Sequence, residues 1–251
     1  MDTLQTGSYS ARAGDVVIAG KSAIERLMPA DYAALRRTMV ERQVRTFDVT
    51  DEAVLARMLA VPREKFLPES LRTLAYSDVA LDLPSAGEGP ARRLMPPLIF
   101  ARMVQASVVG PRDRVLDVAS ATGYSAAIFG GLALSVIALE SDAAFAAKAE
   151  TALADEPMPI KVVRGELTSP PAGEGPFDLI FINGAIEANH ERLLEALAPG
   201  GRLVAILREA GLVARAVRFD KDDRGEIGRR SLFDAPAPIL PGFEKAPAFV
   251  F

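Results

Sequence analysis

Residues 115–127 read VLDVASATGYSAA, and this stretch decides the fold. Its apolar, β-branched start predicts a buried strand over 114–118, and its alanine-rich end predicts a helix that runs to about residue 130. Between them lies a turn of small residues, from Ala119 to Gly123. Such a turn lets a ligand approach the backbone amides at the N-terminus of the helix. The stretch therefore predicts a ligand site at the carboxyl end of a strand.

Strand and helix patterns alternate along the rest of the chain. Apolar runs predict further strands at 135–139, 160–164, 177–182 and 202–207, with helices after the second strand, capped by Asp142, and at about 189–197. After Gly211, the runs LVARAVRF (212–219) and RRSLF (229–233) predict strands that close one edge. Buried strands alternating with helices predict an α/β fold with a mainly parallel sheet covered by helices.

The first 110 residues have a different pattern. Helical spacing predicts helices at 31–43, from an N-cap at Thr50 to residue 61, and at 64–71, and Pro96-Pro97 starts another that Gly110-Pro111 closes. Residues 82–90 (DLPSAGEGP) have the composition of a loop. We expect 1–27 to be a disordered extension, or the product of a mis-assigned start codon. We expect 28–110 to be a helical substrate-cleft region packed on a main domain at 111–251.

Composition excludes several classes of function. Lys and Arg number 29 against 33 Asp and Glu, so the net charge of -4 gives no basic field for nucleic acid. The chain has no Cys and one His, which excludes disulfides, thiolate metal sites, cysteine nucleophiles and multi-His metal sites. No apolar run reaches the roughly 18 residues of a membrane span. The missing Cys and the absence of a secretory signal fit a cytoplasmic location.

The charges near the turn favour one kind of nucleoside. Glu140 stands 17 residues after Gly123, at the end of the next predicted strand, where a carboxylate accepts hydrogen bonds from a ribose diol. A dinucleotide site would need several glycines for a pyrophosphate, but the turn has one glycine and begins at Asp117, which would repel phosphate. An acidic group suits the cationic amino-acid end of S-adenosylmethionine. The turn therefore favours this methyl donor.

Seven motifs resemble the protein-L-isoaspartate O-methyltransferase family. They keep their order and spacing from residue 39 to 207: MVERQ (39–43), VLARMLAVPREKFLP (54–68), AYSDVAL (75–81), PPLIFARM (96–103), VLDVASATGYSAA with IALE (115–140), FDLIFINGA (177–185) and LLEALAPGGRLV (193–204). The resemblance implies a class I S-adenosylmethionine-dependent methyltransferase (Rossmann-like) fold with an N-terminal helical region. It also implies methyl esterification of the free carboxylate of L-isoaspartyl residues in damaged proteins, a repair reaction.

This implied chemistry agrees with the composition. A carboxylate is already an anion at pH 7, and a sulfonium is already an activated leaving group, so placement and exclusion of water suffice. Carried over from the family, Glu140 would hold the ribose, Glu166 would lie near the adenine amine, and Asn183 would face donor and substrate. The full set of implied cofactor-binding residues is Asp117, Ala119, Ala121, Gly123, Tyr124, Glu140, Glu166 and Asn183.

Two departures from the family pattern fall at the site. The family turn, E/D-x-G-x-G-x-G-Y, has Ala119 and Ala121 in place of its first two glycines, and alanine at positive φ would cost about 1 kcal/mol or more. The family's T-I-S-Q-P motif is replaced by RLMPP at 93–97, with Met95 at a hydroxyl position, so no catalytic residue is assigned. Arg92 and Arg93 are candidates to bind an anionic substrate, or are solvated loop arginines.

Three functions follow from these observations. The leading hypothesis is S-adenosylmethionine-dependent carboxyl methylation of isoaspartyl proteins or peptides, without nucleic-acid or membrane partners. The second is a non-catalytic member that keeps the fold as a binding or regulatory module. The third is a methyltransferase for a small anionic metabolite held by Arg92 and Arg93. We expect His190 to lie on the surface, and Met39, Met58 and Met103 to lie in the core.

Overall fold

The computed structural model describes residues 31–84, 92–158 and 160–246, and from Tyr32 onward these belong to one compact unit. The extension expected at 1–27 and most of the loop expected at 82–90 lie outside the described residues. The boundary expected between 110 and 111 stays a prediction. Within the described ranges, none of the helices combines the length and apolar character needed to cross a bilayer.

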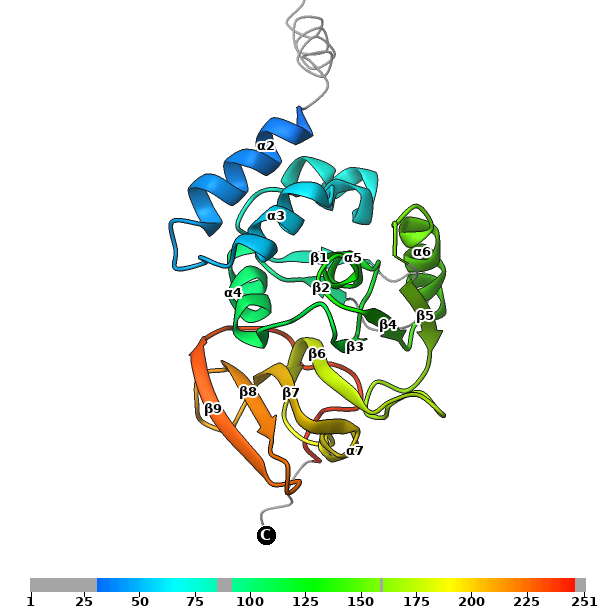
Figure 1. Ribbon diagram of the computed structural model, residues 1–251. Helices are drawn as coiled ribbons and strands as arrows, with labels where there is room; N and C mark the ends of the chain where they lie inside the picture. The colour runs from blue at the N-terminus through cyan, green and yellow to red at the C-terminus, as the bar shows by residue number, and fades with distance from the viewer. Residues whose placement is uncertain (1–30, 85–91, 159, 247–251) are drawn as a thin grey trace, which may run out of the picture. The chain divides into compact units, whose positions relative to one another are not determined.

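A twisted sheet organises the unit (Figure 1). Its strand order is β5-β4-β3-β6-β7-β8-β9, parallel from β5 to β7 and antiparallel at β8 and β9. The chain runs outward from β3 to β5 and then returns to β6, so its order reverses between β3 and β6, where ligands bind in open α/β sheets. The bounds are β3 Arg114–Val118, β4 Ser135–Glu140, β5 Ile160–Arg164, β6 Phe177–Ile186, β7 Leu197–Leu207, β8 Arg215–Lys221 and β9 Ile227–Asp234.

Helices cover the sheet and lead into it. In Figure 1, α4 and α7 lie on opposite sides of the strands. The bounds are α2 Tyr32–Met39, the π-helical turn η1 Val40–Val44, α3 Glu52–Ala60, the 3-10 turns η2 Arg63–Phe66 and η3 Glu69–Leu74, α4 Pro97–Ser107, α5 Tyr124–Gly130, α6 Ala143–Leu153 and α7 Glu191–Glu195. Two short antiparallel strands, β1 Leu81–Leu83 and β2 Arg92–Leu94, pair with each other before α4.

The expected α/β alternation is confirmed, with local corrections. The N-cap of α3 is Asp51, not Thr50, because the Asp51 carboxylate accepts hydrogen bonds from the first free amides of the helix. The predicted helix at 64–71 is wrong: the segment forms the 3-10 turns η2 and η3. The predicted loop at 82–90 begins instead as β1, because cross-strand pairing with β2 outweighs its loop composition. The helix predicted at 189–197 is shortened to α7, since Leu197 already pairs with Phe177 in the sheet.

Both faces of the sheet are buried along its central strands. Along β6, Leu179 and Phe181 pack toward the N-terminal helices, while Ile180 and Ile182 pack in a second cluster with Leu193 of α7. Alternation of this kind follows from the two-residue period of a strand. The expected burial of Met39, Met58 and Met103 is confirmed, since each is 0% exposed.

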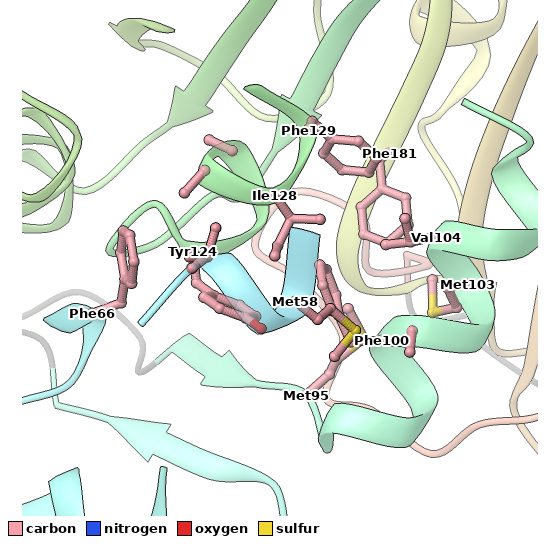
Figure 2. Close-up of a cluster of buried hydrophobic side chains, with 14 of the residues drawn as sticks. Met58, Phe66, Met95, Phe100, Met103, Val104, Tyr124, Ile128, Phe129 and Phe181 are labelled. Atoms are coloured by element: carbon pink, nitrogen blue, oxygen red, sulfur yellow. The ribbon is translucent and has the colours of Figure 1, made fainter. Parts of the chain in front are cut away.

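An aromatic cluster connects α4 and α5 to the sheet (Figure 2). The ring centroids of Phe100 and Tyr124 lie 5.4 Å apart, those of Phe100 and Phe181 lie 5.9 Å apart, and those of Phe129 and Phe181 lie 5.0 Å apart. Tilted and edge-on rings at such distances pack tightly and hold their elements in place. The cluster therefore anchors α5, and with it the turn that precedes α5.

Candidate functional site

The turn between β3 and α5 has a left-handed backbone. The φ angles are 57° at Ala119, 50° at Ala121 and 94° at Gly123. A Cβ on Gly123 would also lie 2.9 Å from a Leu153 methyl carbon, so this position needs glycine for space as well as for φ. Both alanines therefore stand where L-residues are strained, as the sequence analysis anticipated.

Asp117 lies beneath this turn and is completely buried. Its carboxylate accepts a hydrogen bond from the Ser125 hydroxyl at 2.6 Å and one from Asn183 Nδ2 at 2.7 Å. Asn183 Nδ2 also donates to the carbonyl of Val118 at 3.0 Å. Burial raises the pKa of Asp117 to about 7, while these two hydrogen bonds oppose the rise. Asp117 thus connects β3, α5 and β6, and its expected contact with the donor stays a proposal.

Glu140 ends β4 with a carboxylate that is fully paired inside the chain. Arg92 Nη2 lies 2.6 Å from Oε1, and Arg92 Nε lies 3.2 Å from Oε2. The Ala121 amide donates to Oε2 at 3.0 Å, and the amides of Ser141 and Asp142 donate to Oε1 at 2.8 and 3.0 Å. The exposed fractions are 2% for Arg92 and 0% for Glu140. A ribose held by Glu140 would therefore have to take the place of Arg92.

Arg93 differs from its neighbour although both form bidentate ion pairs. Its Nε and Nη2 lie 2.6 and 3.1 Å from the Asp82 carboxylate oxygens, across the β1–β2 pair. The pair is solvent-exposed, with 41% of the Arg93 side chain accessible. This hydrogen bonding lowers the pKa of Asp82 and raises that of Arg93. The expectation that Arg92 and Arg93 bind an anionic substrate stays a proposal, and both guanidinium groups have partners within the chain.

The remaining expected residues lie at different depths. Tyr124 is buried, and its hydroxyl has no hydrogen-bond partner among the described residues. Glu166 follows β5 and is exposed. His190 is half-buried and directly precedes α7, with its ring 5.3 Å from that of Phe219, so it is less exposed than expected. Met95, at the family's hydroxyl position, is buried.

Two cavities adjoin the turn. A small one of about 10 Å³ is lined by Arg63, Met95, Ala119, Ser120, Tyr124 and Asn183, among others. A larger one of about 440 Å³ reaches the turn at Thr122 and is lined also by Lys65, Phe66, Phe145 and Lys148. Neither Arg63 nor Ser120 is among the site residues expected from the sequence. The signal for Arg63 was its position within the VLARMLAVPREKFLP motif.

Comparison with known proteins decides the family. The family model for protein-L-isoaspartate(D-aspartate) O-methyltransferase (PCMT) matches residues 35–234. The chain belongs to this family. A relative named protein-L-isoaspartate O-methyltransferase from Koribacter versatilis (strain Ellin345) is 35% identical over 204 residues, covering 81% of this chain and 89% of that protein. Another of the same name from Methylorubrum extorquens (strain PA1) is 37% identical over 188 residues, covering 74% and 79%.

Solved structures show the same fold at lower identity. A protein-L-isoaspartate O-methyltransferase superposes with a TM-score of 0.72 at 20% identity, covering 84% of this chain and 66% of that chain. A PCMT from Plasmodium falciparum, solved in complex with S-adenosyl-L-homocysteine, superposes with a TM-score of 0.65 at 20% identity, covering 83% and 97%. The expected class I methyltransferase fold is confirmed by these matches and by the strand order of the sheet.

The polar groups at the turn fit the amino-acid end of S-adenosylmethionine. Ser120 Oγ and Tyr124 OH are buried without hydrogen-bond partners in the part of the chain that the structure describes, and both residues line the small cavity together with Asn183. Arg63 adds positive charge that can hold a carboxylate. At the ribose end, Glu140 is already in place below the Ala121 amide, paired with Arg92. The amino-acid end of the cofactor therefore has polar groups that could hold it, whereas the ribose position at Glu140 is occupied by Arg92.

Proposed function

We propose that this chain methylates the free carboxylate of L-isoaspartyl residues in proteins, using S-adenosylmethionine. The observation that carries the proposal is the left-handed turn at the end of β3, within a chain whose residues 35–234 match the isoaspartyl methyltransferase family. A turn with three positive φ angles, two of them in alanine, is strained, and backbone strain of this kind collects at ligand-binding sites.

Each group of the site has a task in this proposal. When bound, S-adenosylmethionine supplies a methyl group on a sulfonium that is ready to leave. Asn183 and Asp117 hold the end of β6 against the turn through their 2.7 Å hydrogen bond, which keeps the floor of the site rigid. The buried side chains of Met95 and Phe100 exclude water from the space beside Tyr124. No side chain is required to remove a proton, because the acceptor carboxylate is already ionised.

The test has two stages on the full chain. Calorimetric titration with S-adenosylmethionine and S-adenosylhomocysteine measures binding to the altered turn. Transfer of a labelled methyl group is then measured to a peptide with one isoaspartyl residue, with the same peptide carrying ordinary aspartate as the control. The proposal expects binding of both nucleosides, and transfer to the isoaspartyl peptide alone.

Other outcomes of these two measurements would support one of the two alternative functions. Binding of the nucleosides without transfer to the peptide would support a small anionic acceptor, which a panel of carboxylate metabolites would identify. If the folded protein gives no heat of binding, the result would support a non-catalytic member of the family. The internal pairing of Glu140 with Arg92 favours this hypothesis. The proposal also includes action in the cytoplasm on damaged proteins. Fractionation of the source cells would test the location.

A further inference from the structure

Arg63 lies beside the donor turn, although it comes from a segment more than fifty residues earlier in the chain. It is the first residue of η2, which is joined to the turn by a 2.7 Å hydrogen bond from the Thr122 hydroxyl to the Phe66 carbonyl. The Phe66 and Tyr124 rings also meet edge-on, with centroids 5.7 Å apart. Figure 2 shows Phe66 and Tyr124 next to each other in this part of the core. The position of Arg63 against the turn is therefore firmly held.

The Arg63 guanidinium is buried with few hydrogen-bond acceptors around it. The residue is 1% exposed, its Nη2 donates to the Met95 carbonyl at 2.7 Å, and its Cζ lies 4.8 Å from the centroid of the Tyr124 ring. Its Nε and Nη1 have no hydrogen-bond acceptor, and it forms no ion pair with a carboxylate in the described part of the chain. Burial lowers the pKa of this guanidinium, while Tyr124, Tyr76 and Asp78 oppose the fall.

Other buried arginines of the chain are differently arranged. Arg92 is paired with Glu140, and Arg202 is paired with Asp113 and donates in addition to three backbone carbonyls. An arginine that serves only the fold is normally satisfied in this way, because a buried cation without an anion is unfavourable. The unpaired state of Arg63 therefore points to a ligand anion.

The surroundings of Arg63 identify the chemical class of that anion. It lines the cavity of about 10 Å³ together with Ser120 and Tyr124, whose hydroxyls are also buried with no hydrogen-bond partner in residues 31–84, 92–158 and 160–246. Several donors that converge on one place suit a carboxylate, which has two oxygens and accepts several hydrogen bonds. The cavity is smaller than a carboxylate, so the flexible Met95 side chain that lines it must move aside.

We propose that Arg63 binds a ligand carboxylate beside the donor turn, through its Nε and Nη1 groups. This proposal rests on the proposed function, which brings two carboxylates to the site. One is the carboxylate of the methionyl end of the donor, and the other is the isoaspartyl carboxylate of the acceptor. Both sources have the same chemistry, and the two arms of the test separate them.

The variant R63M removes the charge and puts an apolar, unbranched side chain in place of the arginine. The donor arm compares S-adenosylhomocysteine with S-adenosyl-3-thiopropylamine, the same molecule without its carboxylate. If Arg63 binds the donor, wild type prefers the carboxylate form by roughly 10- to 100-fold, and R63M abolishes the preference. If Arg63 binds the acceptor, the dissociation constant of S-adenosylhomocysteine stays within about twofold, and the KM of the isoaspartyl peptide rises roughly 10-fold or more.

Controls make each outcome decisive. R72M removes an exposed arginine from the neighbouring η3 and should leave both arms unchanged. R63M should stay folded but melt below wild type, because the Met95 carbonyl loses its donor while no carboxylate is left unpaired. R63Q, which keeps a donor for the Met95 carbonyl, replaces R63M if that variant does not fold. Unchanged affinity in both arms, or the unfolding of both variants, would overturn the proposal.

The failure of the proposed function has a different signature. Wild type that binds S-adenosylhomocysteine but does not methylate the isoaspartyl peptide refutes the acceptor, while the donor arm still tests Arg63. Wild type that methylates the peptide, with R63M equally active at every substrate concentration, refutes Arg63 alone.

Discussion

Replacing Arg92 and Arg93 by methionine, one at a time, compares a buried with an exposed ion pair in adjacent residues. Both guanidinium groups form bidentate pairs, but Arg92 and Glu140 are 2% and 0% exposed at their side chains, against 41% and 64% for Arg93 and Asp82. Breaking a buried pair costs about 3–5 kcal/mol, because one charge is left without its partner. Glu140 keeps three backbone amides as donors, so we expect the lower value, about 3 kcal/mol, for R92M. For R93M we expect about 0–1 kcal/mol.

Thermal and urea unfolding of the two variants measure these differences. At roughly 2–4 °C per kcal/mol, R92M should melt about 6–12 °C below wild type, and R93M at most about 4 °C below. The small loss in R93M should vanish in 1 M salt, about where the Debye length falls to 3 Å, while the loss in R92M should persist. The double variant R92M/E140Q should regain stability relative to R92M, because the group left in the site is then neutral.

Equal losses in R92M and R93M would refute the reasoning, since burial would then have no effect on the strength of the pair. The same variants also test the ribose contact expected at Glu140. If the ribose hydroxyls need the oxygens that Arg92 now holds, R92M should bind S-adenosylhomocysteine more tightly than wild type. Weaker binding by a folded R92M would show that Arg92 assists the ligand instead of competing with it.

Three further predictions test other parts of the fold and site. The free energy of unfolding of A121G should exceed that of the matched helical variant A127G by about 1–2 kcal/mol, because residue 121 has a positive φ and residue 127 is helical. Equal free energies of unfolding of the two variants in urea would disprove the strain at residue 121. Because burial raises the folded-state pKa of Asp117 to about 7, above its unfolded value of 3.8, wild type should lose stability as pH rises from about 4 to 7. The stability of D117N should lack this pH dependence, because asparagine does not ionise. Between pH 5 and pH 8 the free energy of unfolding of D117N should therefore rise by about 2–3 kcal/mol relative to that of wild type. Parallel pH profiles of the two proteins would contradict the raised pKa of Asp117. R202M should lose about 3 kcal/mol or more in the same assay, since Arg202 is buried and bridges the end of α4 and β6; a loss below about 1 kcal/mol would show that these hydrogen bonds are dispensable.

The parallel part of the sheet was largely predictable from residue pattern. The strands β3 and β5 have the predicted bounds, and Asp142 caps α6 as expected, because apolar runs and capping residues act over a few neighbouring positions. The short elements were less predictable. The pair β1–β2 and the early start of β7 arise from contacts between segments distant in the chain, which local composition does not contain.

The site shows the same division. The sequence located the turn, its alanines and the acid that ends β4, and the strain at Ala119 and Ala121 follows from a positive φ that the family's glycines already indicated. It did not indicate that Arg92 would be buried against Glu140, since an arginine in a polar segment has no local signal of burial. It also gave no local signal that set Arg63 apart from its charged neighbours Glu64 and Lys65.

The sequence by itself determined the family, the α/β alternation and the position of the donor turn, because these depend on the order of residues along short stretches. Only the tertiary structure decided which charges are neutralised. It brought Arg92 to Glu140 across 48 positions, and it left Arg63 buried at the turn without an ion pair to any described residue. Whether a charge is paired depends on burial and on which distant segments the sheet brings together, and neither is contained in the neighbouring residues.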